Sequence, residues 1–160
     1  MVLCFCACKE NTQRKKEGHK PAAMSVVQKH VLAVPLEKQI QNKIKNWKAY
    51  TELEQKLKEF SVISANEALN NALELAGLVK IFKSVTKPEP LITLSFKTRI
   101  DVLENEILRL KDMTYISGSL SADEVNEQVD KIMDAFSATN SKINAVYTKL
   151  RIDQEIETEG

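Results

Sequence analysis

Hydrophobic side chains recur at helical spacing along most of the chain after residue 35. In the first stretch they lie three or four residues apart, the period at which side chains share one face of an α-helix. These positions are Leu36, Ile40, Ile44, Trp47, Tyr50, Leu53, Leu57 and Phe60. Lysines and glutamates fill the positions between them, which is typical of a solvated outer face. The pattern predicts an amphipathic helix over residues 36–60.

A second helix is predicted to begin at Ser64. The sequence Ser64-Ala-Asn-Glu67 has the form of a capping box, in which the serine hydroxyl and the glutamate carboxylate each bond to the other residue's backbone N–H. Hydrophobic positions follow nearly all round the helix to Val85, so we expect it to be the most buried. Prolines 88 and 90 then end it, because proline lacks an N–H donor and disfavours helix in the preceding residue.

Two further helices are predicted in the second half of the chain. One carries a heptad pattern, and the Ser117-Gly118-Ser119 stretch ends it. Its seam consists of Phe96, Ile100, Leu103, Ile107 and Leu110. Ser121-Ala-Asp-Glu124 is a second capping box, and apolar positions continue from Val125 to Leu150. This last helix spans about thirty residues, or about 45 Å.

These elements predict an all-α protein of about four amphipathic helices that form an antiparallel bundle or coiled coil. The chain has 160 residues, with only four glycines and four prolines, and a composition dominated by good helix formers. Residues 1–35 lack sustained periodicity, so we interpret them as a flexible leader that contains all the cysteines. The helical domain is expected at 36–152, followed by an acidic tail at 153–160.

The last two predicted helices offer the clearest interaction seam. We expect its side chains to pack against one another within the chain or against a partner helix. They are Ile100, Leu103, Ile107, Ile132, Phe136, Ile143 and Leu150. Thr139, Asn140 and Asn144 interrupt the pattern. Such polar groups either fix the register against a partner or face water at a bend.

Charge and hydropathy argue against nucleic acid and against a membrane-spanning helix. Residues 1–35 hold six basic and two acidic residues, but residues 36–160 hold seventeen basic and twenty acidic. Nucleic-acid binders usually carry a basic face along the whole fold. No apolar run approaches the ~20 residues that span a bilayer, and the N-terminus is a poor signal peptide. We therefore expect a cytoplasmic protein with reduced cysteines.

The three cysteines, Cys4, Cys6 and Cys8, allow three readings. Their alternating spacing, with only His19 and His30 to follow, is a poor match to a tetrahedral zinc site. Acylation fits better, because an acyl chain beside a basic cluster supplies the two signals that stable membrane anchoring needs. The cluster consists of Lys9, Arg14, Lys15, Lys16 and Lys20. The third reading is a leader without chemistry, and we expect membrane contact only through a lipidated leader.

The sequence offers little for catalysis. Both histidines and all three thiols lie before residue 36, and no glycine cluster could cradle a phosphate. The aromatic residues lie on or beside the apolar stripes, which favours a role in core packing. We therefore predict a protein that is not an enzyme, with no catalytic residue, metal or cofactor, and with partners bound through helical packing in a homo- or hetero-oligomer.

Three segments resemble the family of dynactin subunit 3, the small shoulder subunit of dynactin. They are the helix containing Tyr50-Thr-Glu-Leu-Glu-Gln-Lys-Leu-Lys-Glu-Phe60, the apolar helix ending Leu78-Val-Lys-Ile-Phe82, and the final helix from Ile132 to Tyr147. The resemblance covers roughly 36–156 and departs from the family at Leu150, at Ser61-Val-Ile-Ser64 and in the cysteine leader. It implies a cytoskeleton-associated scaffold subunit without an active site.

A rival resemblance is to the coat proteins of rod-shaped plant RNA viruses. The segment from Phe82 to Phe96 looks like the stretch that leaves the second helix of that four-helix family, and Ser121 to Asn144 looks like its last helix. The family grips RNA phosphates with an arginine-rich turn. In this chain the region between Leu110 and Ser121 carries one basic residue, Lys111. A scaffold subunit is therefore our first expectation, and a coat protein or a lipid-anchored coiled-coil adaptor is the alternative.

Overall fold

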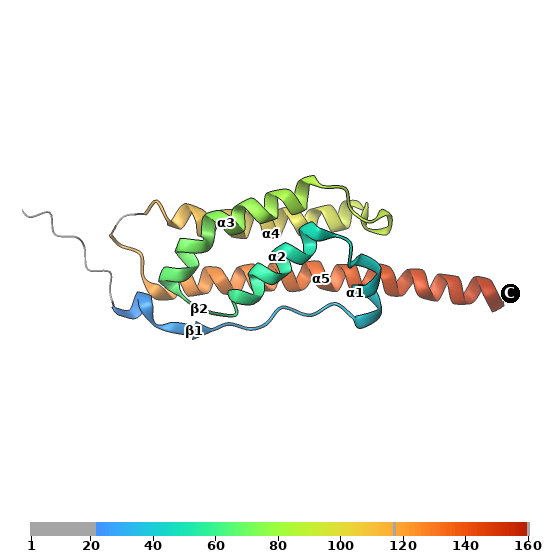
Figure 1. Cartoon of the computed structure of the whole chain (residues 1–160), viewed down its shortest axis with the longest axis horizontal. Coiled ribbons are helices and arrows are strands. Elements are labelled where there is room, and N and C mark those ends of the chain that lie inside the picture. The colour runs from blue at the N-terminus through green and yellow to red at the C-terminus, as the bar shows by residue number, and fades with distance from the viewer. Residues whose placement is uncertain (1–21, 117, 160) are drawn as a thin grey trace, which may run out of the picture.

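The computed structural model describes residues 22–116 and 118–159, and in this part of the chain it is mainly helical (Figure 1). The elements are η1 (Ala22–Ser25), β1 (Val27–Lys29), α1 (Lys38–Ile44), α2 (Lys48–Glu59), β2 (Val62–Ser64), α3 (Ala65–Ser84), η2 (Glu89–Leu91), α4 (Leu94–Met113) and α5 (Ala122–Glu159). The prediction of an all-α fold is confirmed, with five α-helices in the described residues where about four were expected.

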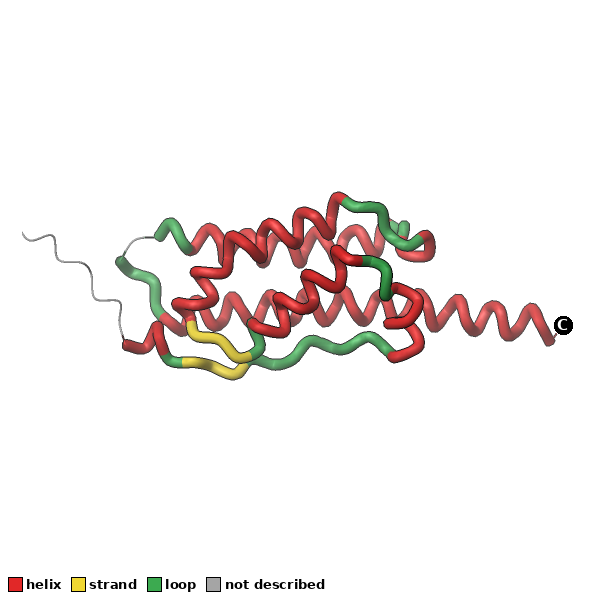
Figure 2. The backbone as a smooth tube through the Cα atoms, in the orientation of Figure 1, coloured by secondary structure: helices red, strands yellow, loops and turns green. Residues whose placement is uncertain are grey.

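The long helices α3, α4 and α5 run side by side, and α2 lies alongside α3 (Figure 1). Chain direction reverses between α4 and α5, so these two helices form an antiparallel hairpin. Gln128 on α5 fixes their register, because its Nε2 donates to the backbone oxygen and to the carboxylate of Glu106 on α4, both at 2.9 Å. Figure 2 shows an extended stretch of chain that leads from β1 to α1.

The first predicted helix is divided into α1 and α2, which corrects the expectation of one helix over 36–60. The break falls at residues 45–47, and α2 begins after Trp47, whose φ of −85° and ψ of 80° are not helical. The break places the Trp47 ring 5.0 Å from that of Phe82 and 5.8 Å from that of Tyr50. Aromatic packing of this kind outweighs one lost helical turn. The apolar spacing continues through the break, so periodicity alone could not reveal it.

Both predicted capping boxes are present. The Ser64 hydroxyl accepts from the backbone N–H of Glu67 at 3.3 Å, and the backbone N–H of Ser64 donates to the Glu67 carboxylate at 3.1 Å. At the start of α5 the same two bonds join Ser121 and Glu124, at 3.2 and 2.8 Å. These bonds satisfy N–H groups that the first helical turn would otherwise leave unpaired.

Residues 22–35 are packed against the bundle, which corrects the prediction of a flexible leader for this part of the chain. Met24 is buried, and β1 pairs with β2 in an antiparallel two-stranded sheet with Val27 opposite Ser64. Neither strand was predicted, because three-residue strands are too short to show the alternation of a β-strand. Residues 1–21, including the cysteines and the basic cluster, lie outside the described residues.

An extended segment, residues 30–37, follows β1 and lies along α5; we call it the strap (Figure 2). From Gln28 to Glu37 there are nine residue steps, about 30 Å of extended chain. The α5 side chains that meet these two residues belong to Asn126 and Asn144, eighteen helical steps or about 27 Å apart. The two segments therefore match in length, and they run in parallel.

Polar side chains of α5 hold the strap in place. Asp130 Oδ1 lies 2.7 Å from Nδ1 of His30, whose side chain has no exposed surface. Ser137 accepts from the backbone N–H of Val34 at 3.1 Å. Asn144 donates to the backbone oxygen of Pro35 and accepts from the N–H of Glu37, at 3.1 and 3.2 Å. Side chains of α5 thus bond to backbone groups of the strap, which has no partner strand among the described residues along this stretch.

Candidate interaction surface

Helix α5 extends beyond the bundle at its C-terminal end (Figure 1). It continues as helix to Glu159 and so includes residues 153–159 of the segment expected as an acidic tail. Tyr147 is still buried, but residues 151–158 are all exposed. We call residues 148–159 the overhang. Among its exposed side chains are two isoleucines, Ile152 at 45% and Ile156 at 65% exposure.

The overhang has an apolar face that points away from the bundle. Ile152 lies nine residues after the buried Ile143, and nine steps of about 100° place the two side chains on opposite faces of α5. Ala145, Lys149, Ile152 and Ile156 share this outer face at spacings of four, three and four, and all four are exposed. We call these four residues the outward stripe. No element in the described part of the chain covers it.

Charge is divided along the same helix. Lys142, Lys149 and Arg151 lie near the bundle, whereas Asp153, Glu155 and Glu157 lie farther out. Arg151 forms an ion pair with Glu155 at 3.2 Å, one turn along the helix. Such an exposed pair contributes little to stability. The division gives the overhang a basic beginning and an acidic end.

Helix α1 braces α5 where it leaves the bundle. Lys43 Nζ lies 5.6 Å from the centre of the Tyr147 ring, a cation–π distance. A small cavity of about 20 Å³ separates the two helices, and its lining includes Lys43, Tyr147 and Arg151. Residues 38–48 contain Lys38, Lys43, Lys45 and Lys48 and no acid. This end of the bundle is therefore basic.

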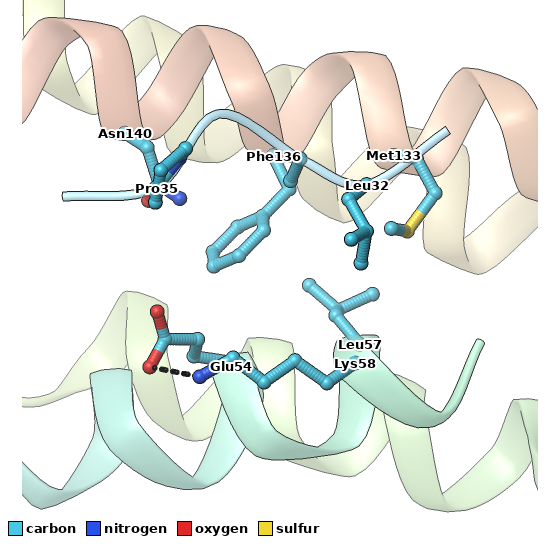
Figure 3. Close-up of a pocket in the computed structure, with 9 residues that line it drawn as sticks. Leu32, Pro35, Glu54, Leu57, Lys58, Met133, Phe136 and Asn140 are labelled. Atoms are coloured by element: carbon cyan, nitrogen blue, oxygen red, sulfur yellow. Dashed lines mark ion pairs between the residues drawn. The ribbon is translucent and has the colours of Figure 1, made fainter. Parts of the chain in front are cut away.

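A separate cavity of about 210 Å³ lies between the strap, α2 and α5 (Figure 3). Leu32 from the strap and Phe136 and Met133 from α5 face Leu57 of α2 across it. Its rim carries the ion pair between Lys58 and Glu54, at 3.1 Å. Apolar side chains dominate the lining, with no cluster of groups suited to acid–base or nucleophilic chemistry.

The predicted seam is buried within the chain itself. The side chains of Ile100, Leu103, Ile107, Ile132, Phe136 and Ile143 are at most 2% exposed. Leu150 is half-buried, where α5 leaves the bundle. The seam positions thus hold the α4–α5 hairpin and the bundle core together. The outward stripe, which sequence analysis missed, lies on another face of α5. In the sequence the only sign of the outward stripe was the spacing of four, three and four residues between Ala145, Lys149, Ile152 and Ile156.

The polar residues that interrupt the last seam bond to groups within the chain. Thr139 is buried and donates to the Ala135 backbone oxygen at 2.9 Å. Asn140, also buried, accepts from the Tyr50 hydroxyl and donates to the Val34 backbone oxygen. Asn144 bonds to the strap. These side chains therefore serve the packing of α2 and the strap on α5.

Cys4, Cys6 and Cys8, the candidate lipidation sites, lie outside the described residues together with His19, and their role stays a prediction. In residues 22–116 and 118–159 no three His, Cys, Asp or Glu side chains are grouped as metal ligands. The same residues contain no helix with the length and apolar character needed to cross a membrane. His30 of the strap bonds to Asp130 of α5, and within the described residues no nucleophile is bonded to this pair.

No protein-family model, curated protein or solved structure matches this chain.

Proposed function

We propose that this chain is a non-enzymatic structural subunit that assembles with other protein through the overhang of α5. The observation that carries the proposal is the outward stripe, with Ile152 and Ile156 exposed on a helix that continues past its own bundle. An apolar stripe at heptad-like spacing is the surface with which one helix packs against another. Over residues 151–158 every side chain of this helix is exposed and can meet a partner.

The remainder of the described chain supports a role in assembly. The polar bonds between α5 and the strap, and the hairpin of α4 and α5, hold the base of α5 in one position. A projecting element on a rigid base loses little conformational freedom on binding, which favours association. The cavity under the strap is mainly apolar, and the two charged side chains that line it, Glu54 and Lys58, are paired with each other.

The narrower form of the proposal is a scaffold subunit of the dynactin type in cytoplasmic, microtubule-based transport. Its support is the resemblance of the segments around Tyr50, Phe82 and Tyr147. A coat protein is the second form, and a lipid-anchored adaptor is the third. The coat protein has less support, since residues 111–121 provide only Lys111 for phosphate.

Size-exclusion chromatography with light scattering tests the general proposal. The full chain is measured alone and after mixing with extract of its source cells. We expect a species heavier than the monomer in at least one of these samples, and we expect Ile152→Asp with Ile156→Asp to abolish it. Leu73→Asp is the matched control, because Leu73 on α3 is 69% exposed but lies away from the overhang.

Two results would contradict the proposal. One is a monomer in both samples, and the other is a heavier species that the double substitution leaves unchanged. RNA in that species, detected by its absorbance and removed by ribonuclease with loss of the assembly, would support the coat-protein reading instead.

A further inference from the structure

The outward stripe reads the same in both directions along α5. Its spacings are four, three and four, from Ala145 to Lys149, Ile152 and Ile156. Two such stripes in antiparallel orientation match position for position. Ala145 of one helix then meets Ile156 of the other, and Lys149 meets Ile152. The overlap is about 18 Å, the length of twelve helical residues.

Charge distinguishes the antiparallel arrangement from the parallel one. In a parallel pair Asp153, Glu155 and Glu157 would lie beside the same three acids of the other helix. In the antiparallel pair the acidic end of one helix lies beside the basic beginning of the other. Lys149 then comes within one turn of the other helix's Asp153 and Glu155, and Lys142 within one turn of its Glu157. Opposite charges at these positions favour one orientation, and like charges exclude the other.

We infer that the partner of the overhang is a second copy of this chain, bound antiparallel through the outward stripes of the two α5 helices. This inference rests on the proposed function and names the partner. The contact is isologous: the same four positions are used by both copies around a two-fold axis. Among the described residues nothing covers the stripe, since the strap and α1 contact α5 on other faces.

The lysine in the stripe fits this partner. Lys149 lies opposite Ile152 of the other copy, so its aliphatic stem packs against the isoleucine while its ammonium group reaches the flanking acids. An uncharged partner stripe would leave the Lys149 ammonium group without a counter-charge. An acidic partner stripe would leave the aliphatic stem of Lys149 without an apolar surface. A basic partner helix would satisfy the acidic end but repel Lys142 and Lys149. A second copy supplies acidic residues beside Lys142 and Lys149, and basic residues beside the acidic end of the overhang.

Directional cross-linking tests the inference. Cys4, Cys6 and Cys8 are first changed to Ser in the full chain, and Ala145→Cys and Ile156→Cys are made separately in that background. On mild oxidation of the mixture we expect a disulfide between Cys at 145 of one copy and Cys at 156 of the other. Ala145→Cys alone should give no covalent dimer, because antiparallel pairing holds the two 145 positions about 16 Å apart along the axis.

Charge reversal provides a second readout that does not depend on disulfide formation. Lys149→Glu places an acid against Asp153 and Glu155 of the other copy, so we expect at least a tenfold weaker dimer in sedimentation equilibrium. Lys131→Glu is the control, because Lys131 is also exposed on α5 but lies outside the overlap. Far-ultraviolet circular dichroism should be unchanged in both variants.

Covalent dimers of Ala145→Cys alone would overturn the antiparallel arrangement. A purified chain that stays monomeric into the high micromolar range would overturn the second copy as partner. In the latter case an Ile152- and Ile156-dependent complex in cell extract would leave the proposed function standing with a different partner. Absence of both the dimer and that complex would remove the proposed function as well.

Discussion

The Tyr50 hydroxyl donates a hydrogen bond to Oδ1 of Asn140 at 3.0 Å, which joins α2 to α5 inside the protein. The amide nitrogen of Asn140 donates in turn to the Val34 backbone oxygen at 2.7 Å. One buried side chain therefore connects two helices and the strap. Burial, together with the nearby Glu54 carboxylate, raises the pKa of Tyr50 well above its ordinary value. The hydroxyl thus remains protonated and able to donate at any physiological pH.

Removing the Asn140 side chain should destabilise the whole domain. Asn140→Ala leaves the Val34 oxygen without its partner and deprives Tyr50 of one acceptor, while a small cavity opens. Unpaired buried polar groups cost about 1–3 kcal/mol, so we expect a loss of about 2 kcal/mol in the free energy of unfolding by urea. Asn70→Ala is the control, because Asn70 is exposed on α3. Equal stability of the two variants would show that the buried bonds contribute nothing.

A second prediction concerns the core beneath the strap. Phe136 is 2% exposed and packs with its ring 6.0 Å from that of Tyr50. Phe136→Ala should cost about 3 kcal/mol, through lost burial and an enlarged cavity next to the existing one. The thermal unfolding midpoint should therefore fall by several degrees, whereas Leu73→Ala on the exposed face of α3 should have little effect. An unchanged midpoint for Phe136→Ala would rule out its place in the core.

The strap gives a prediction about truncation. A chain that begins at Met24 keeps the strap, the buried Met24 and the strand pair, so we expect its helical circular dichroism and unfolding midpoint to match those of the full chain. A chain that begins at Leu36 loses the bonds to Asp130 and Asn140 and exposes the side of α5 that they cover. It should unfold at a clearly lower temperature. Equal midpoints for the two truncated chains would contradict the structural role of the strap.

The two capping boxes should make stability sensitive to acid. Hydrogen bonds from the hydroxyl and backbone of Ser64 lower the pKa of Glu67 below its ordinary value of 4.5. Backbone and hydroxyl bonds from Ser121 do the same for Glu124. A carboxyl with a lowered pKa in the folded state stabilises it above the unfolded pKa, and this stabilisation is lost as the pH falls through the folded value. We therefore expect stability to decline below about pH 4.5.

Replacement of both carboxylates tests this origin of the acid sensitivity. Glu67→Gln with Glu124→Gln keeps a hydrogen-bonding side chain at each N-terminus but removes its titration. The unfolding free energy of this variant should then change less between neutral and acid pH than that of the unaltered chain. A curve of unchanged slope would assign the acid sensitivity to other groups.

Much of the fold follows from local patterns in the sequence. The apolar spacing predicted the long helices, and the serine and glutamate pairs at residues 64 and 121 marked the starts of α3 and α5. Two features depend on contacts between residues that are distant in the sequence, and local patterns did not predict them. The break before α2 exists because Trp47 packs on Phe82, thirty-five residues away. The sequence of the strap shows no periodic hydrophobic pattern, because side chains of α5, and not a regular element, supply its hydrogen bonds.

The candidate site was predictable only in part. The seam residues Ile132, Phe136 and Ile143 were correctly recognised as an apolar face, but a sequence cannot tell whether the chain covers that face itself. The structure places them in its own core and leaves Ile152 and Ile156 exposed. These two isoleucines fall in a segment interpreted as the end of the domain and an acidic tail, where charge obscured the stripe.

The most direct test of assembly through the overhang is amide hydrogen exchange of the purified chain, followed by mass spectrometry at low and high protein concentration. We predict that amides in residues 148–159 exchange fast in the dilute monomer and slow down as the concentration rises. Ile152→Asp with Ile156→Asp should remove this protection and leave residues 125–143 unchanged. Exchange of residues 148–159 that is the same at every concentration and in both proteins would contradict assembly through the overhang.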